Sequence, residues 1–236
     1  LWRLVGTWLQ VFNVVSIFMI DVVKTMNKKL FNPKAALKLL SNMDNDIKTT
    51  IENYGYPPDR SLPANFGSLA RIIVGQQVSR SAATSIWKRL LDIDIEDSNI
   101  ISEVKPEDMM MAGLSRRKSE YIIGIANEIV SGSLDLKSLS NLHGEEVKER
   151  LISIRGVGAW TADNYRLFAL GDMDAWPAND IALQGGMKII KSLDDRPNRE
   201  EMESLGENWR PYRGAGALLL WHVYGVVVKK AIVSNI

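Results

Sequence analysis

The sequence has no cysteine and only two histidines, His143 and His222. Without cysteine the chain can form no disulfide, no cysteine-ligated zinc site and no cysteine-held iron–sulfur cluster. Two histidines are also too few for a histidine-rich metal site. The composition therefore predicts neither a cysteine-ligated metal site nor a histidine-rich one.

An excess of charge of either sign is missing as well. The 29 lysines and arginines are balanced by 28 aspartates and glutamates, which gives a formal net charge of +1 and a sequence pI of about 8.1. A globally basic surface for nucleic acid is thereby excluded. Binding of nucleic acid would have to come from local clustering of basic groups and main-chain amides.

Strand patterns are missing between residues 64 and 171. Apolar residues there recur at helical spacing, as in Phe66, Leu69, Ile72 and Ile73, which lie on one face of a helix. The hydrophobic share of 46% over 236 residues is ample for a core. The sequence thus predicts an all-α protein of one medium or two small domains.

The first 25 residues do not match the rest of the chain. Residues 4–23 are a largely apolar run, long enough to span a bilayer, but polar residues including Asp21 weaken that interpretation. Met26 looks like a natural start. We therefore expect residues 1–25 to be an upstream extension, with a helix packed on the domain or a membrane anchor as alternatives. The functional domain is then residues 26–236.

Two helical stretches, residues 35–40 and 43–51, begin this domain. The segment from Asn53 to Pro63 that follows contains three of the eight prolines. Proline and glycine clusters of this kind interrupt helices, so we expect residues 53–63 to be a linker.

The stretch from Leu151 to Asp180 organises the chain. It predicts the end of one helix, a tight turn over residues 155–158, and a second helix from about Ala159 to Leu170. Gly156 and Gly158 permit positive φ and close approach of another backbone. The first amides of a helix have no partner inside it and carry the positive end of its dipole. This predicts a phosphate site, with an ordinary αα-hairpin as the alternative.

Asp180 is the candidate for chemistry. It precedes an apolar helical stretch that begins at Ile181, so we expect it to be that helix's N-cap, which is a sufficient structural role. The same placement would also fix an ionised carboxylate. Such a group can stabilise positive charge that develops in a reaction, and it can orient or deprotonate a water. Asp163, Asp172 and Asp174 are rivals on residue type alone.

Two polar groups flank predicted helix ends. Gln76 and Gln77 precede Ser79, a predicted N-cap; they could hydrogen-bond a base or a backbone, or they could cap helix ends or face solvent. Arg116, Arg117 and Lys118 follow Ser115, another predicted N-cap. They could meet phosphates or form a solvated helix start.

Packing is the expected role for two further groups. The run of Met109, Met110 and Met111 is expected in the core rather than on a binding surface. Any one tryptophan is more often a core residue than a ligand contact, and we assign Trp87 and Trp176 to the core.

Four motifs in this order resemble the helix-hairpin-helix DNA glycosylase superfamily, in particular its 3-methyladenine (alkylation-repair) branch. They are I-V-G-Q-Q-V-S-x-x-A-A-x-x-I at residues 73–86, G-L-S-x-R-K-x-x-Y-I at 113–122, G-V-G-A-W-T-A at 156–162 with Asp180 beyond it, and N-W-R-P-Y-R-G-A-G-A-L-L-L-W-H-V-Y at 208–224. The resemblance covers about residues 64–225. It implies two helical subdomains with a DNA-binding cleft between them.

The resemblance also implies roles for single residues. The hairpin, about residues 151–170, would hold the DNA backbone, and Asp180 would be catalytic. Trp209 and Arg213 would be structural. The backbone contacts would come from Arg155, Gly156, Val157, Gly158 and Thr161. The pocket for the flipped base would be formed by Trp160, Trp221, Gln76 and Gln77, because an indole face stacks on bases and attracts cationic ones.

One position distinguishes branches of the superfamily. The bifunctional branches carry a lysine where Trp160 stands, and an indole cannot form their Schiff base. The resemblance therefore implies a monofunctional enzyme that leaves an abasic site in an intact strand. Asn164 stands where one branch has a tyrosine, which leaves the range of bases open. The alternatives are a non-catalytic DNA-binding module and a bifunctional glycosylase for oxidised bases.

The resemblance further implies which partners and cofactors to expect. The expected partner is double-stranded DNA with a damaged base. The expected location is intracellular, in the cytoplasm or at the nucleoid, and the protein is expected to be a monomer with no obligate protein partner. No cofactor is expected, no iron–sulfur cluster can form, and a monovalent cation could sit on the hairpin carbonyls.

Overall fold

The computed structural model describes residues 32–234, with side chains through Val228. The extension expected at residues 1–25 lies outside this range. Every regular secondary-structure element between residues 32 and 234 is a helix, which confirms the predicted fold class. The elements are α2 (Pro33–Met43), α3 (Asn45–Tyr54), α4 (Phe66–Val74), α5 (Arg80–Leu90), η1 (Leu91–Ile93), α6 (Ser98–Glu103), α7 (Pro106–Met111), α8 (Arg116–Val130), η2 (Ser138–Asn141), α9 (Gly144–Ile152), α10 (Ala159–Tyr165), η3 (Arg166–Leu170), α11 (Ile181–Ile190), α12 (Arg199–Glu207) and α13 (Arg213–Ser234).

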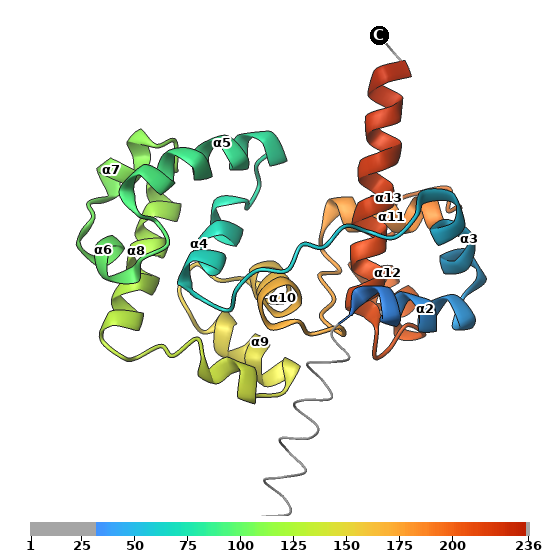
Figure 1. The fold of residues 1–236 in the computed structure, drawn as a ribbon, viewed down its shortest axis with the longest axis horizontal. Coiled ribbons are helices and arrows are strands. Elements are labelled where there is room, and N and C mark those ends of the chain that lie inside the picture. Colours follow the sequence, from blue (N-terminus) through green and yellow to red (C-terminus); the bar gives the residue numbers. More distant parts are fainter. Residues whose placement is uncertain (1–31, 235–236) are drawn as a thin grey trace, which may run out of the picture.

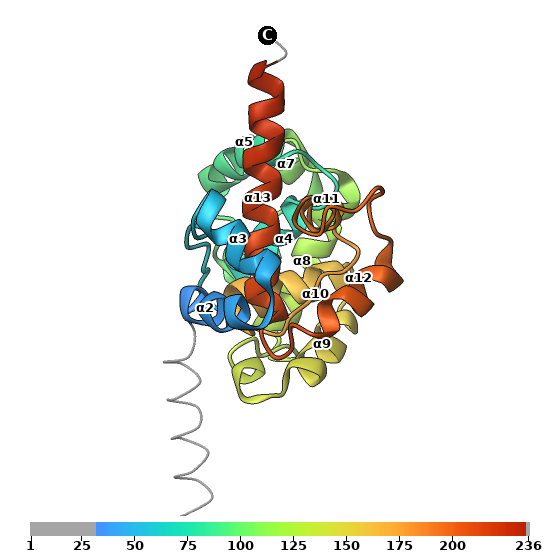
Figure 2. The same ribbon diagram turned by 90° about the vertical axis from the view of Figure 1, so that its right-hand side faces the viewer.

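The helices form two subdomains, each with its own buried core. The first core is built from α4 to α10, with Leu69, Ile122 and Leu151 among its members. The second is built from α2, α3 and α11 to α13, with Leu37 and Leu219 among its members. Figure 1 shows the two groups side by side with α10 between them. Figure 2, viewed from the side of the second subdomain, shows α13 standing in front with α2 and α3 to one side and α11 and α12 to the other.

Within residues 32–234 the chain crosses between the subdomains twice. From α2 and α3 in the second subdomain it reaches the first through the segment 55–65. The linker starts two residues later than predicted, because α3 runs on to Tyr54. It returns through η3 and the connection 171–180. The two crossings are joined where the Leu62 amide donates to the Phe168 carbonyl at 2.8 Å. This contact places the linker directly on the end of the α10–η3 helix.

Local sequence signals set most helix boundaries. Ser79 and Ser115 are the N-caps of α5 and α8, as predicted, and their hydroxyls accept hydrogen bonds from the amides of Ala82 and Lys118. Proline opens α7 at Pro106, where its missing N–H costs nothing. Gly132 follows α8 with φ +77°. These signals act over three or four residues, so they work without any knowledge of the fold.

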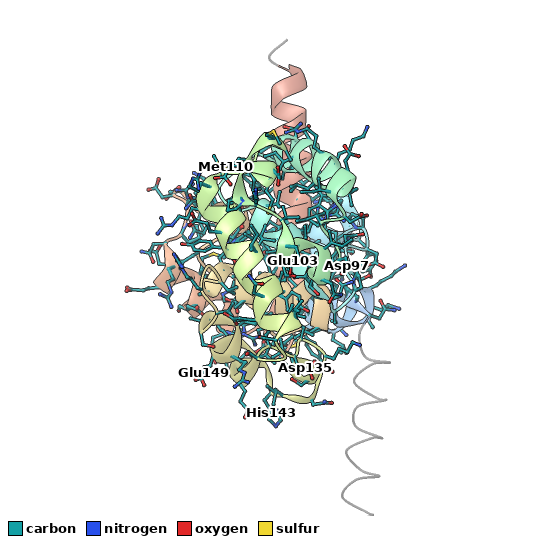
Figure 3. The ribbon with its side chains drawn as sticks, turned by 90° about the vertical axis from the view of Figure 1, so that its left-hand side faces the viewer. Asp97, Glu103, Met110, Asp135, His143 and Glu149 are labelled. Carbon is teal, nitrogen blue, oxygen red and sulfur yellow. The ribbon has the colours of Figure 1, made fainter. Side chains whose placement is uncertain are left out.

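The prediction that Met109, Met110 and Met111 all lie in the core is wrong for two of the three. Met109 is fully buried, whereas Met110 is exposed and Met111 is 79% exposed. Figure 3 labels Met110 on the outer face of the first subdomain. The three residues span α7, which has only six residues. Consecutive positions on a helix point about 100° apart, so a short helix packed on one side can bury only one of them.

Trp87, Trp176, Trp209 and Arg213 are buried, as predicted. Trp176 donates its ring N–H to the carbonyl of Met202 at 3.1 Å. Trp209 donates its ring N–H to Asp44 at 2.8 Å, which fastens the α2–α3 pair to the C-terminal helices.

No helix of the described residues is both long enough and apolar enough to cross a membrane.

Candidate active site

The hairpin between α9 and α10 has the predicted glycine geometry at Gly156, whereas Gly158 has an ordinary φ of −91°. Gly156 has φ +94°, and a Cβ there would overlap the ring of Tyr121. Gly158 is the N-cap of α10, and a Cβ there would meet no other atom within 4 Å. The turn therefore packs on the protein at Gly156 and leaves its backbone open at Gly158. The first amides of α10 have no acceptor within the helix.

The other predicted backbone contacts lie around the same turn. Arg155 is exposed, and its guanidinium lies 5.9 Å from the centre of the Tyr121 ring. The side chains of Val157 and Thr161 are buried. Any contact of these two residues with DNA must therefore come from the main chain.

Gln76 connects the α4–α5 turn to the hairpin. Its side-chain amide donates to the Thr161 hydroxyl at 2.8 Å and to the Gly156 carbonyl at 3.4 Å. Gln77 differs from its neighbour, because it is exposed and has φ +51°. The structure thus separates the two glutamines into one that holds the hairpin and one that faces outward.

Lys118 holds the same turn from the other side. Its ammonium donates to the carbonyls of Val74 at 2.9 Å and Gln76 at 2.6 Å, and burial lowers its pKa. Of its two neighbours in the basic cluster, Arg116 pairs with Glu107 at 2.6 Å and Arg117 donates to the Tyr121 hydroxyl at 2.8 Å. Lys118 is therefore a structural residue of the turn, a role that neither sequence alternative included.

Asp180 is the N-cap of α11, as predicted, and it accepts three hydrogen bonds. Its Oδ1 accepts from the Leu183 amide at 2.8 Å and from the Trp221 ring N–H at 2.9 Å. Its Oδ2 accepts from the Trp160 ring N–H at 2.7 Å. The donors come from α10, α11 and α13, so the carboxylate is fixed by three helices. A carboxylate has about four acceptor sites, which leaves one for a substrate or a water.

The two tryptophans present their edges to Asp180, which leaves their faces for packing. One face of Trp221 is covered by Phe168, with ring centres 5.5 Å apart and planes inclined by 25°. Phe168 belongs to η3, a single π-helical turn that continues α10. Such turns are rare overall, but many of those that occur lie at functional sites. Sequence reasoning missed Phe168. Its only signal is its position eight residues after Trp160, on the same side of the helix.

The rival aspartates are all neutralised by arginine or lysine. Asp163 is buried and pairs with Lys148 at 2.9 Å and Arg166 at 3.0 Å; burial raises its pKa, against the effect of these two cations. Asp172 pairs with Arg166 at 2.8 Å. Asp174 pairs with Arg213 at 2.7 Å. By contrast, Asp180 forms no ion pair with any residue in the described part of the chain, so its charge is available to a substrate.

Asn164 has a structural contact. It is buried in α10, and its side-chain amide donates to the Trp160 carbonyl at 2.7 Å. This bond lies within one turn of the helix that carries Trp160.

A large concavity of the described residues lies away from Asp180 and the hairpin. It is a groove of about 860 Å³ on the first subdomain, lined by α6, the end of α8 and the segment 134–137. Carboxylates of Asp94, Glu96, Asp97 and Asp135 line it, and Figure 3 shows Asp97 and Asp135 on this outer face. Because carboxylates repel phosphates, this groove is unsuited to nucleic acid. Within residues 32–234, no group of three or more His, Asp or Glu side chains is placed to hold a metal ion.

A helical hairpin that is open at Gly158, beside a carboxylate that is fixed without a cationic partner in the described residues, is the arrangement expected of a helix-hairpin-helix protein. Comparison with known families agrees: residues 70–211 match the family model described as "HhH-GPD superfamily base excision DNA repair protein". The chain belongs to the HhH-GPD superfamily.

Individual relatives give the same result. YfjP of Bacillus subtilis, a protein named for DNA-3-methyladenine glycosylase activity, is 31% identical over 165 residues, which cover 66% of this chain and 58% of YfjP. DNA-3-methyladenine glycosylase 1 of Schizosaccharomyces pombe is 30% identical over 190 residues, covering 77% and 83%. The chain thus spans little more than half of YfjP but most of the yeast enzyme.

A solved structure matches over a similar range. The S. pombe 3-methyladenine DNA glycosylase Mag1, in complex with abasic DNA, superimposes with a TM-score of 0.74 at 29% identity. The match covers 79% of this chain and 95% of the Mag1 chain.

Proposed function

We propose that this protein is a monofunctional DNA glycosylase of base excision repair. It removes alkylated bases such as 3-methyladenine from duplex DNA by hydrolysing the N-glycosidic bond. The observation that carries the proposal is the Asp180 carboxylate, fixed at 2.7 Å and 2.9 Å by the ring N–H groups of Trp160 and Trp221 and free of any ion pair in the described residues. The names of the relatives support the same substrate class.

The reaction begins with binding of the backbone. The amides at the start of α10 and the open backbone of Gly158 hold a phosphate, and the damaged nucleotide turns out of the helix. Unstacking costs a few kcal/mol and costs least for a damaged base, which favours lesions. Trp160 and Trp221 then offer aromatic surface to the extruded base, and an indole attracts a cationic base by about 0.5–2 kcal/mol.

Bond cleavage relies on Asp180. A base alkylated at a ring nitrogen is cationic, so it leaves with the bonding electron pair as a neutral molecule and requires no proton from the protein. The positive charge remains on the sugar, where the Asp180 carboxylate stabilises it. A water then adds to the sugar carbon and loses its proton, either to Asp180 or to solvent.

The residue at position 160 determines what happens to the strand. A bifunctional enzyme needs an amine there to attack the sugar and open the backbone. Trp160 is an indole whose N–H is already bound to Asp180, so the product is an abasic site in an intact strand. The reaction as proposed needs no cofactor. A monovalent cation on the hairpin carbonyls, a monomeric state and the lack of an obligate protein partner stay predictions.

Product analysis on methylated duplex DNA tests this proposal. We expect release of free 3-methyladenine, a strand that breaks only after alkali, and no protein trapped on the DNA by borohydride. An unmethylated duplex of the same sequence is the control. Borohydride trapping would show a bifunctional enzyme instead. If the protein binds duplexes but frees no base from methylated, uracil-containing or hypoxanthine-containing DNA, it is a binding module.

A further inference from the structure

The groove on the first subdomain has an apolar lining that is only partly covered. Its buried lining residues are all apolar, namely Phe66, Leu134 and Leu136. Leu91 and Ile100 also line it, and they are 44% and 42% exposed. Large apolar side chains gathered around a concavity on a protein surface are typical of an interaction site. The groove therefore offers apolar surface that the described residues leave without a partner.

The charged residues of the groove are almost all acidic. Four carboxylates line it, against the single ammonium of Lys137; they belong to Asp94, Glu96, Asp97 and Asp135. Four negative charges against one positive leave an excess of negative charge here, although the whole chain has a net charge of +1. None of the four carboxylates forms an ion pair with any residue that the structure describes. Their charge is thus available to a cationic partner.

Two of these carboxylates are held in place by main-chain amides. Asp97 is the N-cap of α6 and accepts from the Asn99 amide at 2.8 Å, and Asp135 accepts from the amide two residues further on at 2.9 Å. The bond from Asn99 lowers the pKa of Asp97, so this group is ionised at neutral pH. The backbone at Glu96 packs closely on α4, since a Cβ on Gly67 would lie 3.3 Å from the Glu96 Cα. The acidic wall is therefore preformed, which reduces the entropy lost on binding.

Helices and loops surround the groove, and this decides how a partner chain can bind. The lining comes from the start of α4, from η1 and α6, from the end of α8 and from the segment 134–137. None of these elements has a strand edge to which an extended peptide could pair. A helix needs no such edge, because it makes its contacts through side chains. Figure 3 shows Asp97 and Asp135 on the outer face of the first subdomain. The groove shares no lining residue with the hairpin 155–158 or with Asp180, so a helix bound there would leave the candidate active site uncovered.

We propose that this groove binds a helical segment of a different protein, with lysine or arginine on one side and apolar side chains on the other. The apolar side packs against Leu91 and Ile100, and the basic side faces the carboxylates. This charge complementarity selects the partner. Nucleic acid and anionic lipid are repelled by the same carboxylates. The inference goes beyond the glycosylase function proposed above and does not depend on it.

Binding of model peptides to the full-length protein provides the first test. The probe is a fluorescently labelled peptide of leucine and lysine at amphipathic helical spacing, about four turns long. One control peptide has glutamate in place of every lysine, and the other has serine in place of every leucine. We expect saturable binding of the leucine–lysine peptide, with each control about tenfold weaker or worse, because each lacks one of the two contributions. Equal affinity for the probe and either control would overturn the proposal.

Neutralising the carboxylates tests the site itself. A four-site variant replaces each carboxylate by the amide of the same shape: Asp94→Asn, Glu96→Gln, Asp97→Asn and Asp135→Asn. The cap of α6 is retained, because asparagine caps a helix as well as aspartate. We expect this variant to melt near the wild-type temperature but to bind the leucine–lysine peptide about tenfold more weakly, with a smaller dependence on salt. Glu103→Gln is the matched control, because Glu103 lies on α6 and on the same face but outside the groove. Wild-type affinity in the four-site variant would contradict the assignment.

Two further measurements identify the location and the occupant. Hydrogen exchange with the leucine–lysine peptide present should slow in residues 91–100 and 129–137, and slowing confined to other segments would refute the groove as the site. Sedimentation velocity of the wild type alone tests the occupant. Dimers that the wild type forms and the four-site variant does not would show that the groove binds a second copy of this chain instead of a different protein.

Base release from methylated duplex DNA separates this inference from the glycosylase function. The four-site variant should release base at the wild-type rate, because none of its four positions belongs to the candidate active site. Peptide binding without base release by either protein would refute the glycosylase function alone. Base release that falls in the four-site variant, while its melting temperature is unchanged, would show that the groove serves the reaction and would overturn the docking role.

Discussion

The ring N–H of Trp160 points at the carboxylate of Asp180, with 2.7 Å between Nε1 and Oδ2. Trp221 does the same from α13, with 2.9 Å between Nε1 and Oδ1. The edges of the two indoles therefore fix the carboxylate, and we propose that their faces contact the extruded base. One face of Trp221 is already covered by Phe168.

Replacing Asp180 by asparagine should separate catalysis from folding. Asparagine is as good an N-cap as aspartate, so α11 should be retained, while the amide nitrogen in place of Oδ2 cannot accept the Trp160 N–H and should lower the melting temperature moderately. Loss of the carboxylate charge should slow release of 3-methyladenine by about 10²–10³-fold, the usual effect of removing one preorganised electrostatic group. Single-turnover base release at saturating protein measures this. Affinity for an abasic duplex should stay within about threefold of wild type, since the hairpin main chain that holds the DNA backbone is unchanged.

Replacing Trp160 or Trp221 by phenylalanine should test the edge contacts alone. Phenylalanine keeps an aromatic face but cannot donate to Asp180. A hydrogen bond to a charged group contributes about 1.5–3 kcal/mol, so we expect base release to fall about ten- to hundredfold in each variant. Trp209→Phe is the matched control, because it also loses an indole bond to a carboxylate, but to Asp44 instead of Asp180. Wild-type rates in both test variants would show that the N–H groups do not position the carboxylate.

The two glycines of the hairpin should respond differently to substitution. Gly156→Ala adds a methyl group against Tyr121 at a positive φ, so it should cost more than about 1 kcal/mol of folding free energy and weaken DNA binding with it. Gly158→Asn keeps a good N-cap and meets open space. It should stay as stable as wild type but bind duplex about tenfold more weakly, as for one lost charged hydrogen bond. Urea unfolding and duplex titration, run on both variants, give the comparison.

Replacing the two neighbouring glutamines should have different effects on stability. Gln76→Ala removes the bond to Thr161 at 2.8 Å and should destabilise the protein by about 1 kcal/mol. Gln77→Ala removes an exposed side chain and should leave stability within about 0.5 kcal/mol of wild type, while still weakening binding to lesion-containing duplex if Gln77 meets the DNA. Equal stability of both variants would contradict the role assigned to Gln76.

Asp44 should make stability depend on pH. Burial alone would raise its pKa, but the hydrogen bonds from Lys191 and Trp209 outweigh burial and hold the pKa below its ordinary value of 3.8. Because its folded-state pKa is lowered, ionised Asp44 stabilises the folded protein at every pH above the ordinary pKa. This contribution is lost as the pH falls through the folded-state pKa. Asp44→Asn should therefore destabilise by about 1.5–3 kcal/mol at pH 7, with the difference shrinking below pH 3.8.

Urea unfolding at a series of pH values measures this effect. Asp46→Asn is the control, because Asp46 contacts the same lysine at 2.8 Å but is half exposed. Exposed pairs contribute at most about 1 kcal/mol. A larger effect at Asp46 than at Asp44 would contradict the assignment.

The sequence alone determined the features that depend on neighbouring residues. The all-α class, the caps at Ser79, Ser115 and Asp180, and the glycine turn at Gly156 all follow from signals within a few positions. Such signals work because capping and backbone conformation are local. The motifs in their order were specific enough to indicate the superfamily, which the family match then established.

Only the tertiary structure decided which way each side chain points. Trp160 and Trp221 were expected from sequence as stacking surfaces; their N–H groups at Asp180 depend on residues 20 and 41 positions away from it. Gln76 and Gln77 are adjacent in the chain, yet only Gln76 reaches Thr161, 85 positions along. Long-range packing sets these directions, because it fixes how helices from both subdomains meet, and no short stretch of sequence contains that information.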